Sequence, residues 1–432
     1  MTDFLQNGVI TTLHNLTRRP VESLEAELRQ FARRRPMSLI LPSLYSELTG
    51  PALPRIIEEL AQVDYLAEIV VGLDQADEDQ YRHARTFFSA LPQRVHILWN
   101  DGPRLRALDA ELAEKDLAPR NAGKGRNVWY CIGFTLSLGR SQCIGLHDCD
   151  ILTYDRQLLA RLFYPVANPA SDLRFCKGYY ARVTEAGSLS GRVTRLFVTP
   201  LLRALRVILG SNDYIEFLDS FRYPLAGEFS MRTDVASQIR IPDDWGLEIG
   251  VLSEIYRNLS KRQVCQVDIA DNYDHKHQEL SIQDSNAGLS RMSHEIAKAI
   301  YRKLATEGVV ISEGFFRTLK ATYFRTALDM LVQYSYDAKI NGLRLDCHVE
   351  EQAIETFAQG VILAGESFLA NPLEVPFIPN WNRVMAAIPD FPGRLVTAVA
   401  EDVRATAEAG SRQPGPPAST EAQAKTEEST GE

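Results

Sequence analysis

The sequence predicts a doubly wound α/β domain followed by a mostly helical region, and three observations support this fold class. Short apolar runs alternate with helical stretches over the first 150 residues or so. Polar residues stand at the ends of three of these apolar runs, in "PSLYSE", "GLDQAD" and "HDCD". From about residue 285 only helical periodicity remains. Since open α/β sheets bind ligands at the carboxyl ends of their strands, we expect the functional site there.

Four apolar runs have the length and composition of buried parallel strands. These predicted strands are 37–44, 66–73, 94–99 and 142–148. Good helix formers with helical spacing separate them, and the predicted helices are 51–63, 77–90 and 124–139. This alternation is typical of parallel strands joined by crossover helices.

The second part of the chain, 285–400, is predicted to be mostly helical. It could pack on the sheet, form an oligomer interface, or both. The segment 316–336 is rich in Tyr and Phe and is the part we expect in a homodimer interface, the alternative being packing within one chain. The last stretch, 411–432, has no aromatic residue and many Pro, Gly, Ser, Thr and Glu residues, which predicts disorder.

Composition excludes several classes of protein. Lys and Arg number 47 against 56 Asp and Glu, so the net charge of −9 argues against a nucleic-acid binder. The six cysteines show no Cys-x-x-Cys pair and the start lacks a signal-peptide pattern, which predicts a cytoplasmic protein. The most apolar segment contains Arg203 and Arg206, so we expect a buried helix there and no membrane span.

Asp148 and Asp150 follow the fourth predicted strand, in "CIGLHDCDIL". If strand geometry continues to this point, the alternation of side chains directs both carboxylates to the same side. Two such carboxylates suit Mg²⁺ or Mn²⁺. An isolated Asp-x-Asp is more often a loop with two solvated aspartates, so other motifs must support the metal site.

Several further motifs favour anionic ligands. "NAGKGRN" places Lys124 between two glycines at a helix start, where a phosphate is stabilised, although the Gly spacing is not that of a P-loop. "SGRVTRLF" places Gly191, Arg192 and Thr194 at another helix start, which fits a carboxylate or phosphate. Glu228, in the apolar "YPLAGEFSMR", is either buried and paired or functional.

Taken in order, these motifs resemble a GT-A glycosyltransferase. The strand ending in Leu-Pro-Ser is followed by Gly-Lys-Gly, Asp-Cys-Asp, "GRVT", "PLAGE", "GLEIG" and a late His. More narrowly, the chain resembles the retaining glucosyl-3-phosphoglycerate synthases and their glucosylglycerate and mannosylglycerate relatives over about residues 35–285. The resemblance implies a Rossmann-like GT-A catalytic domain at 36–284, between an N-terminal extension at 1–35 and the helical region.

The resemblance also assigns functions to individual positions. It implies a nucleotide-sugar site formed by strand ends and the lysine, namely Pro42, Ser43, Leu44, Glu47, Asp74, Lys124 and Asp148. It implies an acceptor site formed by Gly191, Arg192, Val193, Thr194 and His277. Asp150 and His275 would ligate the divalent metal. Glu228, with Asp148, would act at the reacting centre by holding the donor's hydroxyls or the acceptor near the anomeric carbon.

The implied reaction is retaining transfer of glucose from UDP-glucose or GDP-glucose to 3-phosphoglycerate, without a dedicated carboxylate nucleophile. Two departures from the family pattern affect details. Glu47 stands one place later than the family's glutamate, where this chain has Ser46. His277 replaces the asparagine of a His-Arg-Asn motif, so it could bind the acceptor or be the metal ligand in place of His275. Free glycerate as acceptor, a mannose donor, and a nucleotide-sugar-binding protein without catalysis remain as alternatives.

Overall fold

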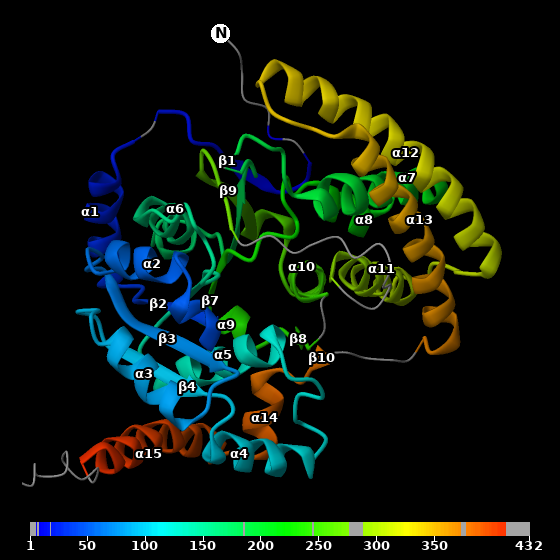
Figure 1. The fold of residues 1–432 in the computed structure, drawn as a ribbon. Helices are drawn as coiled ribbons and strands as arrows, with labels where there is room; N and C mark the ends of the chain where they lie inside the picture. Colours follow the sequence, from blue (N-terminus) through cyan, green and yellow to red (C-terminus); the bar gives the residue numbers. More distant parts are fainter. Residues whose placement is uncertain are drawn as a thin grey trace, which may run out of the picture.

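The computed structural model describes residues 6, 8–17, 19–184, 186–243, 246–275, 288–372 and 377–411. Within them, a central β-sheet is covered by helices on both faces, and a helical arm extends from one side (Figure 1). The predicted α/β fold class with a helical C-terminal region is therefore confirmed.

Eight strands form the main sheet, in the order β1-β9-β6-β7-β5-β2-β3-β4. Their bounds are β1 Thr11–Leu13, β2 Met37–Leu44, β3 Leu66–Asp74, β4 Val95–Trp99, β5 Cys143–Leu146, β6 Phe175–Tyr180, β7 Phe229–Arg232 and β9 Val264–Ala270. All neighbours are parallel except β7, which is antiparallel to β5 and β6. The four strands predicted from apolar runs are β2, β3, β4 and β5.

Helices of the first 260 residues connect and cover these strands. They are α1 Val21–Ala32, α2 Ala52–Leu60, α3 Glu78–Phe88, α4 Pro103–Ala113, α5 Lys124–Leu138, α6 Arg156–Ala167, α7 Thr199–Leu209, α8 Asp213–Asp219, α9 Thr233–Ala236 and α10 Leu247–Asn258. Three short turns of other helix types are η1 Tyr45–Thr49, η2 Val193–Val198 and η3 Lys261–Gln263.

Side-chain alternation along the buried strands generates two cores. In β2, Ile40 packs in the core that includes Trp129 of α5, whereas Leu39 and Leu41 pack in the core that includes Phe163 of α6. Successive residues of a strand point to opposite faces, so an uninterrupted apolar run requires cover on both. This requirement explains why "MSLIL" forms a central strand. Because both faces of the strand are covered, the first place where polar side chains can gather is beyond its apolar run, at the carboxyl end.

The C-terminal region is helical, as predicted, but its helices lie in two places (Figure 1). The first group is α11 Gly288–Thr306, α12 Glu313–Ile340 and α13 Cys347–Ala370. In this group α12 and α13 form a long hairpin that packs on α7 and η2. The second group is α14 Trp381–Ala387 and α15 Phe391–Ser411, which return to the first half of the chain.

Two anchors hold the returning segment. β10 (Phe377–Ile378) pairs with β8 (Ile241–Pro242) in a separate small sheet. The Trp381 indole stacks on Trp129 with ring centroids 4.3 Å apart and donates a hydrogen bond of 2.9 Å to the Trp129 carbonyl. The last helices therefore brace α5, whose first residue is Lys124.

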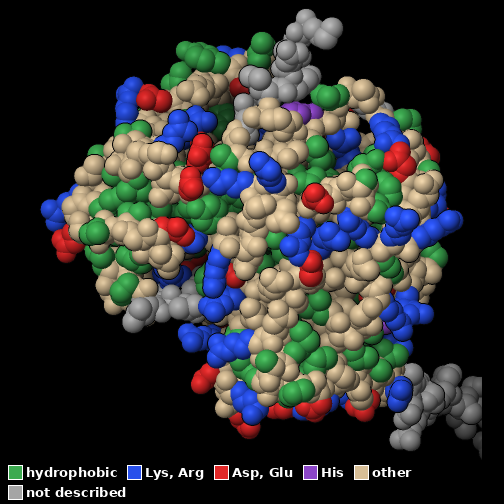
Figure 2. Space-filling model, turned by 180° about the vertical axis from the view of Figure 1, so that it is seen from behind, with side chains coloured by type: hydrophobic (Ala, Val, Ile, Leu, Met, Phe, Trp, Pro, Cys, Tyr) green, Lys and Arg blue, Asp and Glu red, His purple; other side chains and the backbone are tan. Residues whose placement is uncertain are grey.

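At the other end of the chain, the predicted N-terminal extension contributes β1, which pairs with β9 at the sheet edge, and α1, which packs on α6. The predicted disordered segment lies outside the described residues except for Ser411, the last residue of α15. Acidic and basic side chains both occur on the face seen in Figure 2. In the described part of the chain, no helix combines the length and apolarity needed to span a bilayer.

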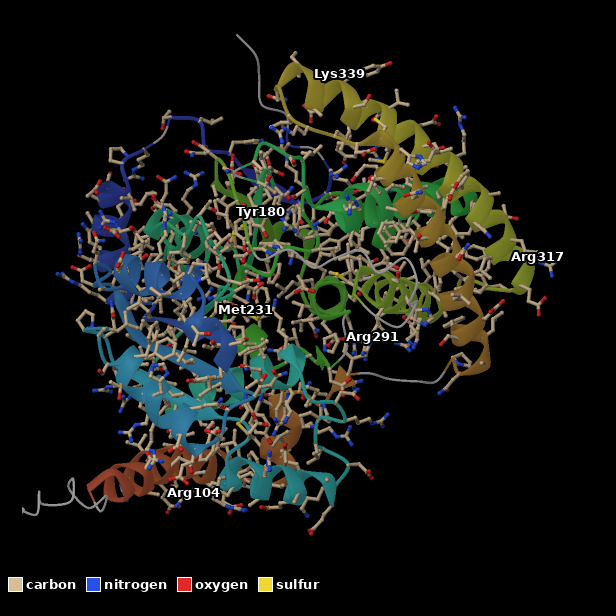
Figure 3. All side chains as sticks on the ribbon, in the orientation of Figure 1. Arg104, Tyr180, Met231, Arg291, Arg317 and Lys339 are labelled. Carbon is tan, nitrogen blue, oxygen red and sulfur yellow. The ribbon has the colours of Figure 1, made fainter. Side chains whose placement is uncertain are left out.

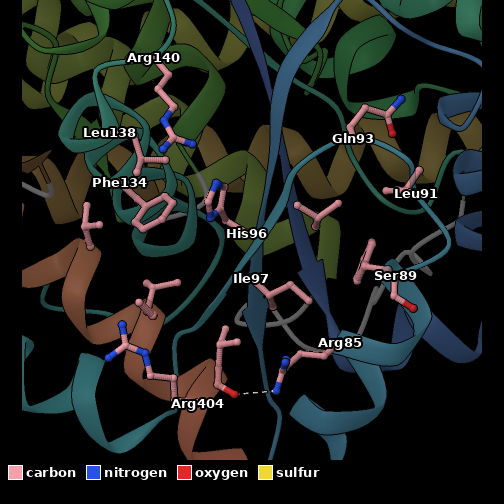
Figure 4. Close-up of a pocket in the computed structure, with 16 residues that line it drawn as sticks. Arg85, Ser89, Leu91, Gln93, His96, Ile97, Phe134, Leu138, Arg140 and Arg404 are labelled. Carbon is pink, nitrogen blue, oxygen red and sulfur yellow. Dashed lines mark hydrogen bonds between the residues drawn. The ribbon is translucent and has the colours of Figure 1, made fainter. Parts of the chain in front are cut away.

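A cavity of about 670 Å³ lies between the edge strand β4 and α15 (Figure 4). Its described lining is mostly apolar, with Arg85, Arg140 and Arg404 among the polar members and no carboxylate. Arg85 of α3 donates a hydrogen bond of 2.9 Å to the Val403 carbonyl and so helps to fix α15 against α3. Because it offers no acidic ligand, this cavity is unsuited to a divalent cation.

Candidate active site

A larger cavity, of about 850 Å³, opens at the carboxyl ends of β2, β3 and β6 and beside the turn after β5. The sequence-predicted residues that line it are Pro42, Ser43, Leu44, Glu47, Asp74, Lys124, Asp148, Asp150, Gly191, Arg192, Val193, Thr194 and His275. Glu228 does not line it, and His277 lies outside the described residues. The structure thus brings the predicted donor, metal and acceptor residues to one site.

Asp74, the last residue of β3, is held by two asparagines. Asn100 donates a hydrogen bond of 2.8 Å to its Oδ1, and Asn127 of α5 donates one of 3.0 Å to its Oδ2. Burial raises the pKa of Asp74, while these hydrogen bonds oppose the increase. Asn127 also binds the carbonyl of Gly72, where any side chain would collide with it. Glycine at position 72 therefore leaves room for Asn127, which helps to orient the Asp74 carboxylate.

Lys124 begins α5 and reaches into the cavity floor. Its Nζ lies 2.7 Å from Asp148 Oδ1 and 3.3 Å from Glu248 Oε1. Desolvation alone would lower its pKa, but the two carboxylates raise the pKa of Lys124 above its usual range. The preceding Gly123 has φ 149°, a backbone conformation that side chains disfavour. The Gly-Lys-Gly motif therefore delivers a permanent cation to the base of the cavity.

The strand geometry assumed for the two aspartates is wrong. β5 ends at Leu146, and Asp148 and Asp150 lie on the turn that follows it. They nevertheless face the same cavity. Because the Lys124 ammonium compensates desolvation, the pKa of Asp148 is below its ordinary value, whereas burial and the charge of Asp148 raise the pKa of Asp150 to about 7.

Asp150 and His275 are held side by side by the backbone. Ile151 and His275 form an antiparallel bridge, and His275 Nδ1 lies 3.8 Å from Asp150 Oδ2. No group of three or more His, Cys, Asp or Glu side chains suited to a metal occurs among the described residues. A carboxylate and an imidazole fit Mg²⁺ or Mn²⁺ in a mode where water and substrate phosphates supply the other ligands. A second carboxylate, Asp148, adds negative potential beside them.

Glu228 lies behind the cavity wall, fully buried. Its Oε2 accepts a hydrogen bond of 2.8 Å from Tyr180, and its Oε1 accepts one of 2.6 Å from Tyr273. The two rings stack with centroids 3.7 Å apart, and both line the cavity. Burial, and then the charge of Asp148, raises the pKa of Glu228. A side chain at the preceding Gly227 would collide with the Asp148 carboxylate, which accounts for the glycine of "PLAGE".

The Gly-Arg-Val-Thr segment, which also lines the cavity, forms a cradle. Gly191 has φ 76°, a left-handed conformation that favours glycine, and η2 begins two residues later. The Thr194 hydroxyl is buried, lines the cavity and has no hydrogen-bond partner among the described residues. Arg192 also lines the cavity and donates a hydrogen bond of 2.7 Å from Nε to Glu350. An unpaired hydroxyl beside a guanidinium suits an oxygen-rich anion.

Several residues that line the cavity were not predicted from the sequence, namely Tyr180, Arg182, Tyr223, Glu248, Tyr273, Leu289, Arg291 and Met292. Figure 3 labels Tyr180 of β6 and Arg291 of α11. Glu248 had a usable signal, since it stands in "GLEIG". Arg182 and the α11 residues had none, because their place at the cavity depends on packing between distant segments.

Comparison with known proteins identifies the family. The chain is 48% identical over 402 residues to the glucosyl-3-phosphoglycerate synthase of Persephonella marina, an alignment that covers 93% of this chain and 99% of that protein. The chain belongs to the glucosyl-3-phosphoglycerate synthase family. A second synthase, from Methanococcoides burtonii, is 37% identical over 93% of this chain and 98% of its own length. No model of a known protein family matches the chain.

Solved structures agree with this family's fold. Mannosyl-3-phosphoglycerate synthase from Rubrobacter xylanophilus superposes with a TM-score of 0.52 at 23% identity, covering 70% of this chain and 83% of that one. Glucosyl-3-phosphoglycerate synthase from Mycobacterium tuberculosis, in complex with phosphoglyceric acid, gives a TM-score of 0.50 at 21% identity over 69% and 88% of the two chains. These structures confirm the predicted fold, and the two sequence relatives confirm the predicted glycosyltransferase class.

Proposed function

We propose that this chain transfers glucose from UDP-glucose to 3-phosphoglycerate, with retention at the anomeric carbon and with Mg²⁺ or Mn²⁺. The observation that carries the proposal is that the Asp150–His275 pair and the Gly191–Thr194 cradle line the same cavity. A similar combination of ligands, Mn²⁺ with UDP-glucose and phosphoglyceric acid, is bound by the synthase from Mycobacterium tuberculosis.

At the donor side, Asp150 and His275 would hold the divalent cation. When bound, the cation supplies charge neutralisation for the diphosphate that departs. The Lys124 ammonium, at the N-terminus of α5, stabilises the same negative charge, and the helix dipole adds to this stabilisation. Pro42, Ser43, Leu44, Glu47 and Asp74 line the part of the cavity assigned to the nucleotide.

The position of Glu228 supports transfer without a glycosyl-enzyme intermediate. Both of its carboxylate oxygens are engaged by tyrosine hydroxyls, and it has no exposure to the cavity. We propose that the acceptor hydroxyl attacks the same face of the sugar from which the diphosphate leaves, and that a leaving phosphate oxygen takes its proton. Glu228 then acts through Tyr180 and Tyr273, whose rings it holds against the substrate space.

Glu228→Gln should lower kcat without trapping a covalent sugar. The amide can accept one tyrosine hydrogen bond but must donate to the other, so we expect a loss of roughly 10- to 100-fold, the equivalent of one or two misplaced hydrogen bonds. The check is steady-state kinetics combined with intact-protein mass spectrometry after incubation with UDP-glucose. A folded but inactive variant that accumulates a hexose adduct would contradict the mechanism.

The acceptor is assigned as 3-phosphoglycerate because the cradle supplies cations for a second charged group. Arg182 and Arg192 both line the cavity, and the Arg182 side chain lies beside Gly191 of the cradle. The test is nucleoside diphosphate release from UDP-glucose, GDP-glucose and GDP-mannose, each with 3-phosphoglycerate, with glycerate and without an acceptor. Release that depends on 3-phosphoglycerate supports the proposal, whereas release with glycerate alone favours a glucosylglycerate or mannosylglycerate synthase. Nucleotide binding without any release would indicate a non-catalytic binding protein.

A homodimer is proposed on the basis of α12. Val332, Tyr336 and Ile340 follow one another at intervals of four residues, and their exposed fractions are 49%, 64% and 85%. Exposed apolar side chains on one helix face are typical of an interaction surface. Light scattering should give twice the chain mass, and Tyr336→Ser with Ile340→Ser should give a monomer.

We also propose a cytoplasmic location, which the six free cysteines support.

A further inference from the structure

The loop that carries the acceptor cradle is paired with the turn of the α12–α13 hairpin. Ser188 and Arg344 form a parallel backbone bridge. The Arg344 amide donates a hydrogen bond of 2.8 Å to the Gly187 carbonyl, and the Leu189 amide donates one of 3.3 Å to the Arg344 carbonyl. The helical arm is therefore attached to the segment that ends in Gly191 and Arg192.

One side chain from the arm reaches the cradle itself. Glu350 lies in the first turn of α13, and its side chain is 3% exposed. Its Oε1 accepts a hydrogen bond of 2.7 Å from Arg192 Nε, and its Oε2 accepts one of 2.8 Å from Arg195 Nη2. Each oxygen of the buried carboxylate thus binds a different arginine.

Arg195 is itself held in place by contacts with the cradle loop and with α12. Its Nε donates a hydrogen bond of 2.8 Å to the Ser190 carbonyl, and its guanidinium lies 5.1 Å from the centroid of the Tyr334 ring on α12. Its side chain is 8% exposed. Arg195 is therefore a fixed second cation, so the group of Glu350, Arg192 and Arg195 keeps a net positive charge.

The contact between Glu350 and Arg192 determines which guanidinium nitrogens of Arg192 remain available to bind an anion in the cavity. Arg192 is 30% exposed and lines the cavity, while its Nε is engaged by Glu350. Its two Nη groups have no partner among the described residues. A guanidinium held by Nε offers both Nη groups in a fixed plane, which is the geometry for binding two oxygens of one anion.

We propose that Glu350 is a positioning residue that fixes Arg192 for the phosphate of the acceptor, so that the α12–α13 arm forms part of the acceptor site. This inference rests on the proposed transfer to 3-phosphoglycerate. The opposite effect is physically conceivable, because a carboxylate next to Arg192 weakens its attraction for an anion. Positioning dominates here because Arg195 balances the charge of Glu350, and because an unrestrained Arg192 would lose side-chain entropy on binding.

The test is Glu350→Gln, with the exposed neighbour Glu351→Gln as the matched control. We expect KM for 3-phosphoglycerate to rise roughly 10- to 100-fold, the equivalent of one charge-assisted hydrogen bond, with kcat and KM for UDP-glucose changed less than about twofold. Turnover with glycerate, which lacks the phosphate, should change much less. The control should match the wild type for both acceptors.

A mutant cycle shows whether Glu350 acts through Arg192. In an Arg192→Ala background, Glu350→Gln should have no further effect on KM for 3-phosphoglycerate. If Glu350→Gln does not fold by circular dichroism and thermal unfolding, Glu350→Asp replaces it, since aspartate keeps the charge but is one methylene shorter and cannot keep both arginine contacts. It should produce the same rise in KM.

Four outcomes overturn the inference. Three of them are a lower KM for 3-phosphoglycerate in Glu350→Gln, an equal loss with glycerate and 3-phosphoglycerate, and additive effects in the cycle. The fourth is an active wild type with an unaffected Glu350→Gln variant, which leaves the proposed function intact. A wild type that releases no UDP with 3-phosphoglycerate overturns the proposed function itself.

Discussion

Asp150→Ala should lower kcat/KM for acceptor-dependent UDP release by roughly 1000-fold, because loss of the cation removes several kcal/mol of charge stabilisation at the departing diphosphate. Asp150 Oδ2 lies 3.8 Å from His275 Nδ1, and these two are the described residues assigned to the metal. Mn²⁺ affinity, measured by electron paramagnetic resonance with UDP present, should fall in parallel. This binding measurement does not depend on turnover.

The control for Asp150→Ala is Asp329→Ala, which removes a half-exposed carboxylate from the surface of α12. It should leave both Mn²⁺ affinity and kcat/KM unchanged. His275→Ala should resemble Asp150→Ala, and a silent His275→Ala together with a damaging His277→Ala would transfer the ligand role to His277. Full Mn²⁺ affinity in Asp150→Ala would show that the metal site lies elsewhere.

Lys124→Met should lower kcat/KM by roughly 100- to 1000-fold, the range found when one preorganised donor to a developing negative charge is removed. Nζ of Lys124 is 2.7 Å from Asp148 and 3.3 Å from Glu248. Methionine preserves the length of the side chain but leaves the two carboxylates without their shared cation. UDP affinity should therefore fall as well, and calorimetric titration of UDP measures this directly.

Lys124→Arg provides the charge-conserving comparison and should retain more activity than Lys124→Met. Lys320→Met, on the exposed surface of α12, should have no effect. If Lys124→Met binds UDP as the wild type does and loses only its thermal stability, Lys124 has a structural role in holding Asp148 and is not a ligand of the diphosphate.

Much of this molecule follows from local sequence patterns. The apolar runs define β2, β3, β4 and β5, because a strand buried on both faces needs an uninterrupted apolar stretch. The polar ends of these strands then predict the side of the sheet where Asp74 and Asp148 gather. Gly-Lys-Gly predicts the start of α5, since glycines before a helix permit the backbone turn that exposes its amide groups.

Local patterns did not predict the position of a side chain where that position depends on a residue distant in the sequence. Strand alternation predicted the relation between Asp148 and Asp150, yet β5 ends at Leu146 and a turn brings both carboxylates to the cavity. Glu228 was recognised as buried or functional, but the tyrosines that enclose it come from β6 and from the segment after β9. Sequence spacing contains no information on which tyrosine will reach a given carboxylate.

The sequence by itself therefore determined the α/β fold class and the edge of the sheet where the cavity opens, and it predicted Lys124, Asp150 and Arg192 among the charged groups that line this cavity. Tertiary structure alone decided that Glu350, 158 residues after Arg192, fixes its guanidinium, and that α15 returns to brace α5. The physical reason is the distance along the sequence over which each interaction acts. Strand and helix signals are contained within a few neighbouring residues, whereas the direction of a buried charge depends on whichever segments pack around it.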